Sequence, residues 1–376
     1  MKIAIIGTRG VPGRYGGFET LADQLAVRLS DHGHRVTVYC RRAFASPTDD
    51  YDARVRRVIL PGLRSKYFDT VFHTFLSVLH VIATDVDVAL ICNVANSPFA
   101  WIPRIFGIPT VLNVDGLDRK RRKWSFIGKT YLYLCELLSL ITPTRLLTDS
   151  RHIEKYFRER YGAASAVIAY GAEVPEGAMS EPSRFEARRY ILFVGRFEPE
   201  NNLELILKAY RQVETDWPLV VVGGNPYRPK YERELRALAD SRVVFTGPVY
   251  GNRYWELQRN AGIFIMAGEV GGTHPSLVEA MAAGSAVLFL DTSENSETVA
   301  DAGVSFKHSA ADLAEKLQDL VASSELREQM SALARRRAAT AYSWNTIANQ
   351  YEALLCDACG HVPSASPLRL ADQEES

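Results

Sequence analysis

The feature that most constrains the fold is a series of short, almost wholly apolar segments separated by stretches with helical periodicity. Up to residue 172 these segments lie at 2–7, 35–40, 55–60, 86–92, 109–114, 145–150 and 166–171. Strands this apolar are typical of a parallel sheet covered by helices on both faces. After residue 189 the alternation restarts at 190–195, 218–224, 242–247, 262–268 and 286–291. Because 376 residues suffice for two cores, we expect an α/β protein with two Rossmann-like, doubly wound domains facing across a cleft.

The domain boundaries follow from changes in composition. We expect an N-terminal domain at 1–172, a linker rich in Pro, Gly, Ser and charge at 173–189, and a second domain at 190–341. A helix at 342–357 is expected to pack back on the N-terminal domain. The polar, aperiodic tail at 358–376 is expected to be disordered.

Charge and cysteine usage exclude some classes of protein. Lys+Arg and Asp+Glu number 44 each, so no bulk charge points to nucleic acid. No segment has the roughly 18 uninterrupted apolar residues of a spanning helix, and MKIAIIG reads as a strand. Cys356 and Cys359 form a lone C-x-x-C near His361, too few ligands for a zinc site. We therefore expect a cytoplasmic protein without a metal site.

The loop GTRGVPGRYGGFET (7–20) joins the first strand to the first helix. It lacks the dinucleotide fingerprint G-x-G-x-x-G, which would need glycine at Arg9. Gly16 and Gly17 lie at a helix N-terminus, where free N–H groups and the helix dipole favour an anion. Arg9 and Arg14 are candidates to bind the same anion or an acceptor. The alternative is a flexible loop whose glycines only serve turns.

The second domain offers two further strand-to-helix loops. Arg196, in VGRFEPENN (194–202), suits a diphosphate because its planar fork offers paired donors. In GEVGGTHPSLVEAMAAG (268–284), Glu279 lies among apolar neighbours and needs hydrogen-bond donors, which ribose hydroxyls would supply. The alternatives are a surface arginine and a solvent-facing glutamate.

These motifs together resemble a known family. Strand-GR at 194–196, GGTHPSLVEAMAAG and YSWNTIANQY (342–351) resemble glycosyltransferase family 4, whose members are retaining, nucleotide-sugar-dependent enzymes of GT-B architecture. A subgroup of this family, the bacterial rhamnosyltransferases of surface polysaccharide synthesis, is resembled by three further segments: TRGVPGRYGGFET, DGLDRKRRKW (115–124) and AYGAEV (169–174).

The resemblance implies roles for particular residues. Glu279 would bind the donor ribose, and Arg196 the diphosphate, where it would act catalytically. Gly16 and Gly17 would lie beside the diphosphate, and Gly272, Thr273 and His274 would form the turn facing the donor sugar. It also implies a nucleoside-diphosphate sugar, with dTDP-rhamnose our choice, a lipid-linked saccharide acceptor, and neither cofactor nor catalytic metal.

Three positions depart from the family pattern. Gly271 stands where the family has the first glutamate of its pair, and Asn201 stands where it has a lysine. Asp115 stands where many members have a histidine, which makes it a candidate catalytic base on the acceptor side. The alternative is a loop cap for Gly116. The D-x-D at 85–87 opens an apolar strand on the side away from the expected cleft, so we expect capping there and not metal binding.

The basic run RKRRK (119–123), followed by Trp124 and an apolar helix at 125–141, suits an anionic membrane surface. Since the subgroup's acceptors are lipid-linked, we expect peripheral association with the cytoplasmic membrane. The alternative is a solvated charged loop.

Two other functions remain open from the sequence. The first is an NAD(P)-dependent nucleotide-sugar enzyme, in which Arg41 and Arg42 bind a 2′-phosphate. The broken fingerprint and the absence of a Tyr-x-x-x-Lys pair argue against it. The second is a non-catalytic sugar-nucleotide-binding subunit, suggested by the departures at Gly271 and Asn201.

Overall fold

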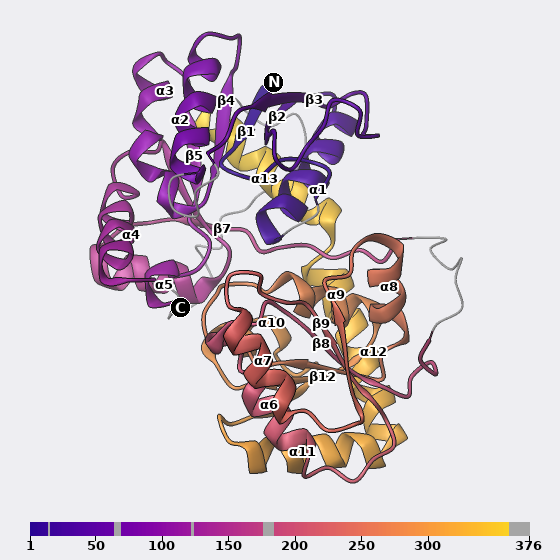
Figure 1. The fold of residues 1–376 in the computed structure, drawn as a ribbon. Coiled ribbons are helices and arrows are strands. Elements are labelled where there is room, and N and C mark those ends of the chain that lie inside the picture. Colours follow the sequence, from indigo (N-terminus) through magenta and orange to yellow (C-terminus); the bar gives the residue numbers. More distant parts are fainter. Residues whose placement is uncertain (14–15, 64–68, 122–123, 176–183, 361–376) are drawn as a thin grey trace, which may run out of the picture.

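The computed structural model describes residues 1–13, 16–63, 69–121, 124–175 and 184–360. It contains two α/β domains, stacked one above the other, each built on a parallel sheet (Figure 1). Arg14, Arg122 and Lys123, His361, the middle of the expected linker and nearly all of the expected tail lie outside the described residues.

The first sheet has seven strands in the order β3-β2-β1-β4-β5-β6-β7. Its strands are β1 (Lys2–Ile6), β2 (Arg35–Arg41), β3 (Arg56–Leu60), β4 (Val88–Cys92), β5 (Thr110–Asn113), β6 (Arg145–Thr148) and β7 (Ala166–Val167). All neighbouring strands pair in parallel, as their apolar sequences predicted.

The second sheet has six strands in the order β10-β9-β8-β11-β12-β13, again all parallel. Its strands are β8 (Ile191–Val194), β9 (Leu219–Val222), β10 (Val243–Gly247), β11 (Ile263–Met266), β12 (Ala286–Leu290) and β13 (Val304–Phe306). The sequence did not predict β13, because three residues are too few to show periodicity.

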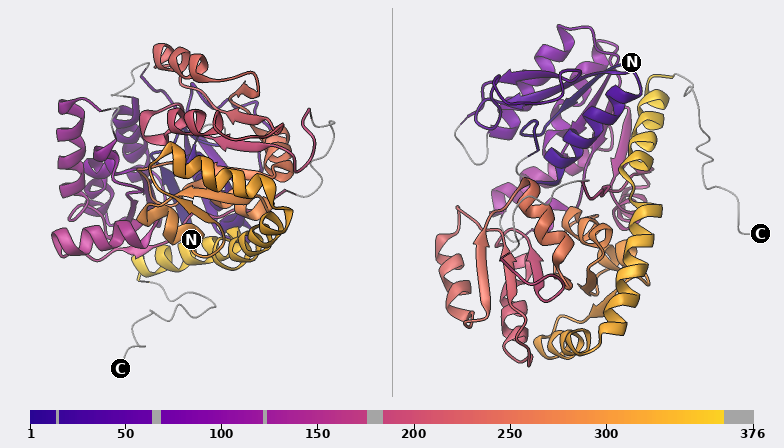
Figure 2. Two further views of the ribbon diagram at one scale, coloured as in Figure 1. Left: turned by 90° about the horizontal axis from the view of Figure 1, so that it is seen from below. Right: turned by 90° about the vertical axis from the view of Figure 1, so that its right-hand side faces the viewer.

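Helices cover both faces of each sheet (Figure 2). In the N-terminal domain they are α1 (Gly17–Asp31), α2 (Asp69–Ile82), α3 (Trp101–Ile105), α4 (Phe126–Leu138) and α5 (Arg151–Tyr161), with 3-10 turns η1 (Val94–Phe99) and η2 (Asp118–Lys120). In the second domain they are η3 (Pro199–Asn201), α6 (Leu203–Tyr210), α7 (Pro229–Leu238), α8 (Gly251–Asn260), α9 (Pro275–Ala283), α10 (Ser293–Val299), α11 (Ala310–Ala322) and α12 (Ser324–Ala341). None of the helices in these described ranges is long and apolar enough to cross a membrane.

The last helix, α13 (Trp344–Ala358), belongs to the N-terminal core. It continues from α12 along one side of the molecule and returns to the upper domain (Figure 2). Trp344, Ile347 and Tyr351 are buried against α1 and the first sheet. Tyr351 also accepts a hydrogen bond of 2.9 Å from Asn113 at the end of β5, so the helix supports a strand that leads to the candidate site.

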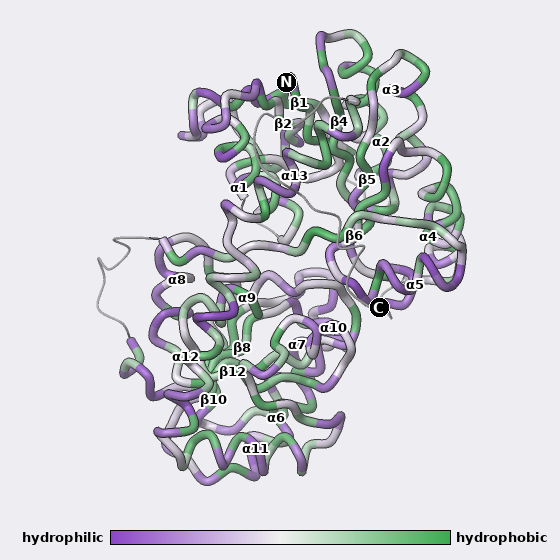
Figure 3. The backbone as a smooth tube through the Cα atoms, turned by 180° about the vertical axis from the view of Figure 1, so that it is seen from behind, coloured by the Kyte–Doolittle hydropathy of each residue, from purple (hydrophilic) through white to green (hydrophobic). Residues whose placement is uncertain are grey.

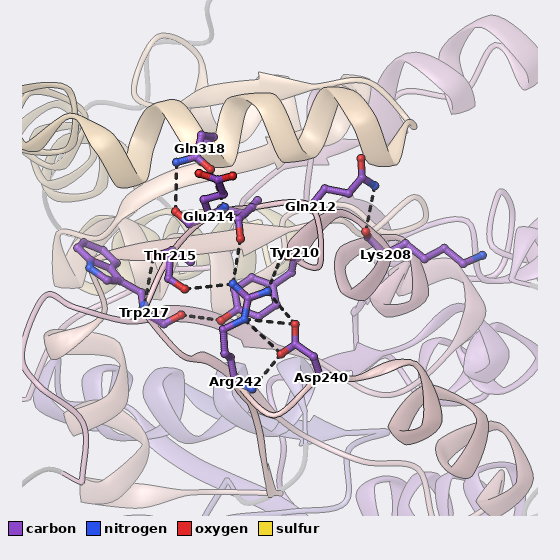
Figure 4. Close-up of polar contacts among 10 residues, drawn as sticks. Lys208, Tyr210, Gln212, Glu214, Thr215, Trp217, Asp240, Arg242 and Gln318 are labelled. Atoms are coloured by element: carbon purple, nitrogen blue, oxygen red, sulfur yellow. Dashed lines mark hydrogen bonds and ion pairs between the residues drawn. The ribbon is translucent and has the colours of Figure 1, made fainter.

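Arg242 is the centre of a set of polar contacts at the amino-terminal end of strand β10 (Figure 4). Arg242 donates to the carbonyls of Val213 and Thr215, pairs with Asp240 at 2.7 Å, and stacks over the Tyr210 ring. Arg242 therefore joins the loop after α6 to the start of β10. These contacts lie at the amino end of β10, opposite the carboxyl ends of the strands, where the candidate site lies.

Candidate functional site

The loops at the carboxyl ends of the two sheets meet where the domains touch. A Cβ on Gly116, after β5, would lie 2.8 Å from the Gly271 backbone, after β11. A Cβ on Gly17 would lie 3.2 Å from Cγ of Pro275, the first residue of α9. The first-domain glycine loop and the second-domain turn were predicted separately, and they lie side by side.

The glycine loop contains a carboxylate that the sequence analysis missed. Gly16 precedes α1 in an extended conformation, and Glu19 in the first turn is buried. Its Oε1 accepts a 2.9 Å hydrogen bond from the Arg9 N–H, while the Arg9 guanidinium lies 4.5 Å from the Phe44 ring. Burial raises the pKa of Glu19, and the loop amide and Arg9 charge oppose that rise. An i, i+10 contact of this kind leaves no periodic signal in the sequence.

Glu279 is buried on α9, as its apolar neighbours predicted. Tyr254 of α8 donates to its Oε2, and Gln258 donates to the Tyr254 oxygen at 2.8 Å. Burial raises the pKa of Glu279 to about 7, although the Tyr254 hydrogen bond lowers it. The carboxyl is thus held in one orientation at the second-domain side of the interface.

Arg196 follows β8 and is exposed. Its guanidinium makes no hydrogen bond or ion pair with any other residue in the described part of the chain, so it is available to a ligand. The Asn201 side chain donates 2.7 Å to the Arg196 carbonyl and closes the loop on which the arginine stands. Asparagine at the lysine position therefore has a structural role here.

His274 explains the departure at Gly271. The His274 ring lies where a Gly271 side chain would begin, with Cε1 2.7 Å from the position of an added Cβ, so a glutamate at 271 would require the ring to move. Burial and the charges of Arg121 and Arg196 lower the pKa of His274 to about 4, so the ring is neutral at pH 7. The nearest carboxylate of this turn, Glu269, is held by Asn202 and His308 at 3.0 Å each.

Asp115 lies at the carboxyl end of β5 with φ 53°, a left-handed conformation that costs free energy for a residue other than glycine. Its N–H donates to the Asn113 side chain at 3.0 Å. Desolvation in the cleft raises the pKa of Asp115, and a nearby Asp118 charge adds to the effect. Backbone strain together with a desolvated carboxyl is typical of a functional position.

Two arginines of the basic run that follows, Arg119 and Arg121, form ion pairs with carboxylates of the same domain. Arg119 pairs with buried Glu136 at 2.6 Å, and Arg121 pairs with Asp118 at 2.7 Å. Arg121 also attracts Glu200, whose two buried carboxylate oxygens have no hydrogen-bond partner among the described residues. Within the run Lys120 is exposed. Arg121 and Glu200 are further site candidates that sequence reasoning missed.

Two other predicted features lie elsewhere. Arg41 is buried, where it pairs with Asp69 at 2.6 Å and donates to the Thr8 carbonyl, so its guanidinium is not offered to a 2′-phosphate. Asp85 and Asp87 lie at the amino ends of the strands, where Asp87 accepts from the Lys2 N–H at 2.7 Å and Asp85 pairs with the Lys2 side chain. Both carboxylates cap strand ends opposite the site.

The raised pKa of Glu279 predicts a stability effect. Since folding raises this pKa from 4.5 to about 7, the native state holds the proton more tightly, and the associated stability is lost as pH rises through 7. We expect unliganded Glu279→Gln to match wild type near pH 4, below the unfolded pKa, and to be more stable by about 3 kcal/mol at pH 8. Chemical denaturation at both pH values measures this, with exposed Glu234→Gln as control. A difference that does not change with pH would contradict it.

Comparisons with known proteins match each half of the chain to a separate family model. Residues 178–337 match the family model described as Glycosyl transferases group 1, and residues 1–173 match one described as Domain of unknown function (DUF1972). The lipopolysaccharide 1,2-N-acetylglucosaminetransferase of Salmonella typhimurium is 25% identical over 239 residues. The match covers 55% of this chain and 61% of that relative, so the chain spans less than two thirds of the relative's length.

Solved structures share the whole architecture. Sucrose-phosphate synthase (tll1590) from Thermosynechococcus elongatus superposes with a TM-score of 0.78 at 19% identity, covering 94% of this chain and 98% of that one. Anabaena Alr3699/HepE, solved in complex with UDP, has a TM-score of 0.75 at 16% identity and covers 95% of this chain and 100% of its own. These likenesses and the two parallel sheets confirm the predicted GT-B fold.

Proposed function

We propose that this chain, a GT-B protein with a group 1 glycosyl transferase domain, is a retaining, metal- and cofactor-independent glycosyltransferase of family 4. It moves a sugar from a nucleoside diphosphate to a lipid-linked saccharide during surface polysaccharide assembly. The observation that carries the proposal is the meeting of Gly17 and Pro275, two helix N-termini, one from each domain. Both helix dipoles favour an anion there, and the exposed Arg196 is close enough to influence the adjacent His274.

Each site residue has a distinct task in this reaction. Glu279 accepts hydrogen bonds from the donor ribose. Arg196 and the amides at Gly16 and Gly17 stabilise the charge that develops on the diphosphate leaving group, the kind of interaction that is usually the largest catalytic contribution. Neutral His274, with Gly272 and Thr273, borders the donor sugar. Asp115, on the acceptor side, orients the attacking hydroxyl or accepts its proton.

The choice of donor sugar and acceptor rests on sequence resemblance. The loops at 8–20 and 115–124 resemble those of rhamnosyltransferases, which favours dTDP-rhamnose, and the Salmonella relative is named for a lipopolysaccharide sugar transfer. A UDP- or GDP-sugar is the alternative donor. Of the two arginines suggested for a 2′-phosphate, Arg42 is exposed and Arg41 is buried in an ion pair, which disfavours an NAD(P)-dependent enzyme. A non-catalytic subunit is the remaining alternative, and turnover excludes it.

The test is transfer of labelled sugar from dTDP-, UDP- or GDP-sugars to bacterial membrane lipid extracts, without added metal. Rhamnose transfer supports the full proposal, whereas transfer from another donor retains the reaction class and corrects the sugar. Anomeric NMR analysis of the product tests retention. Failure to transfer sugar from any donor, with nucleotide binding intact, would favour the binding subunit.

An apolar face of the N-terminal domain supports peripheral membrane association. Large apolar side chains are exposed on α2, α3 and α4 and just after α3 and α4: Phe75, Leu79, Trp101, Ile105, Phe106, Phe126, Ile127, Tyr131, Tyr133, Leu134 and Ile141. Figure 3 shows hydrophobic residues in this region. Arg104 of α3 donates to the Ile141 carbonyl at 3.0 Å, so α3 and the end of α4 are adjacent. Within these helices the exposed charged side chains are Arg104 and Lys129, both basic, which suits an anionic bilayer.

Vesicle sedimentation tests this face. Phe126 and Ile127 are 85% and 80% exposed, and burying such side chains contributes about 1.5–3 kcal/mol each. We expect the double variant Phe126→Ser, Ile127→Ser to bind phosphatidylglycerol vesicles at least about tenfold more weakly than wild type. Tyr227→Ser, at an exposed tyrosine of the other domain, is the control. Equal binding by the double variant and wild type would contradict a membrane role for the face.

A further inference from the structure

The start of α5 is held by the second domain on both sides. Just before the helix, Asp149 Oδ2 accepts a 3.0 Å hydrogen bond from the Thr273 N–H, and the Thr273 hydroxyl donates to the Asp149 carbonyl at 2.7 Å. At the helix itself, Glu297 of α10 accepts from the N–H groups of Arg151 and His152 at 2.7 and 3.0 Å. Asp149 and Glu297 are therefore carboxylates that bond to backbone N–H groups across the domain interface.

Asp149 differs from Glu297 because it also contacts a second carboxyl. Its side chain is buried at 1% exposure and lies beside the Asp115 side chain, which acts on it electrostatically. Its Oδ1 has no donor among the described residues. Two ionised carboxylates offer only acceptors, so a proton held between the two side chains would supply the donor that Oδ1 lacks. Desolvation and the neighbouring Asp115 charge raise the pKa of Asp149 well above its usual range, which agrees with a retained proton.

The surroundings reinforce this protonation. The titratable groups that interact electrostatically with Asp115 or Asp149 are Cys92, Asp118, Arg121, Tyr170 and Tyr351. In the second domain, Glu200 and His274 interact electrostatically with Arg121. Among these Arg121 is the cation, and Asp118 already pairs with it at 2.7 Å. If both Asp115 and Asp149 were ionised, no unpaired cation among these groups would balance the second negative charge.

We propose that Asp149 is a positioning residue that couples docking of the donor turn to the orientation of Asp115, through its hydrogen bond to Thr273 and a proton shared with the Asp115 carboxyl. This inference rests on the proposed function. When the domains separate, Asp149 loses the Thr273 N–H, and the pair loses the donor that fixes its geometry. Asp115 is then oriented for an acceptor only when the donor turn is docked.

The decisive test does not need a sugar substrate. Infrared difference spectra at pH 7 compare wild type with Asp149→Asn and Asp115→Asn, which keep side-chain size and an acceptor oxygen. Because Glu279 is also partly protonated at pH 7, all of these proteins carry Glu279→Gln. We expect the band of a buried protonated carboxylic acid in that background and its loss when either aspartate is also replaced. Glu297→Gln, which alters the other interdomain carboxylate, is expected to keep the band. Circular dichroism confirms that each variant folds.

Kinetics then test the positioning role. We expect Asp149→Ala to lower kcat about 100-fold, as misplaced reacting groups do, with donor affinity nearly unchanged, and Asp149→Asn to recover part of the loss. A band that persists in Asp149→Asn, or a wild-type kcat in Asp149→Ala, would overturn the inference. If wild type itself transfers no sugar, the proposed function fails, whereas the infrared result still decides whether the proton is shared.

Discussion

Replacing Arg196 with alanine is expected to lower kcat about 100- to 1,000-fold, the range seen when one group that stabilises developing charge is removed. The guanidinium is exposed and has no partner among the described residues, so nothing else in the protein needs it. His274 is neutral, and of the two cations that act on it Arg121 is already paired with Asp118, whereas Arg196 is not paired. The loss should therefore fall on the reaction and not on folding.

Steady-state kinetics and calorimetry separate the possible outcomes. Affinity for the nucleoside monophosphate, which lacks the second phosphate, is expected to change little in Arg196→Ala. Arg196→Lys keeps the charge without the planar fork and should recover only part of the rate. Arg211→Ala, at another exposed arginine of this domain, is the matched control. Equal kcat in Arg196→Ala and Arg211→Ala would remove Arg196 from the mechanism.

Replacing Gly272 with alanine is expected to prevent the two domains from docking. A Cβ at this position would overlap the Asp149 carboxyl, which belongs to the other domain and is buried. Because the Asp149 carboxyl is buried and accepts a hydrogen bond from Thr273, relieving the overlap disrupts this contact between the domains. We expect kcat to fall by at least about 100-fold, since displacement of about 1 Å at a reacting centre already costs that much.

Small-angle scattering with bound nucleotide measures the docking directly. Gly272→Ala should keep a larger radius of gyration than wild type when nucleotide is added, while nucleotide affinity is retained. The double variant Gly272→Ala, Asp149→Ala removes the overlapping carboxyl and should regain the compact form, although not the rate. A compact Gly272→Ala protein with wild-type turnover would mean that docking at this contact is not needed.

The fold was largely predictable because its signals are local. Apolar runs such as 86–92 and 286–291 are recognisable as strands from their own residues, without knowledge of the strands they pair with. The loops that contain Gly16–Gly17 and Gly272 each follow a strand directly. Parallel order and burial then follow from general rules. Glu279 was predictable for the same reason, because its apolar neighbours on α9 carry it into the core.

The rest of the site depends on contacts across long sequence separations. Asp149 lies within a segment that reads as a strand, and its partner Thr273 is 124 residues away. The basic run at 119–123 suggests an exposed charged surface, yet Glu136 and Asp118 pair with Arg119 and Arg121. In each case the distant partner decides the role, and a single sequence does not identify that partner.

The central claim is that the interface around Glu279 binds a nucleoside-diphosphate sugar. A thermal-shift titration without metal tests it most directly, comparing dTDP-rhamnose, UDP-sugars, GDP-sugars and NADPH on wild type and Glu279→Ala. A ligand at 100 times its dissociation constant adds about 2.7 kcal/mol of stability. We predict stabilisation of wild type by dTDP-rhamnose that is lost in Glu279→Ala. Stabilisation by NADPH alone, or equal stabilisation of both proteins by the sugar nucleotide, would contradict the claim.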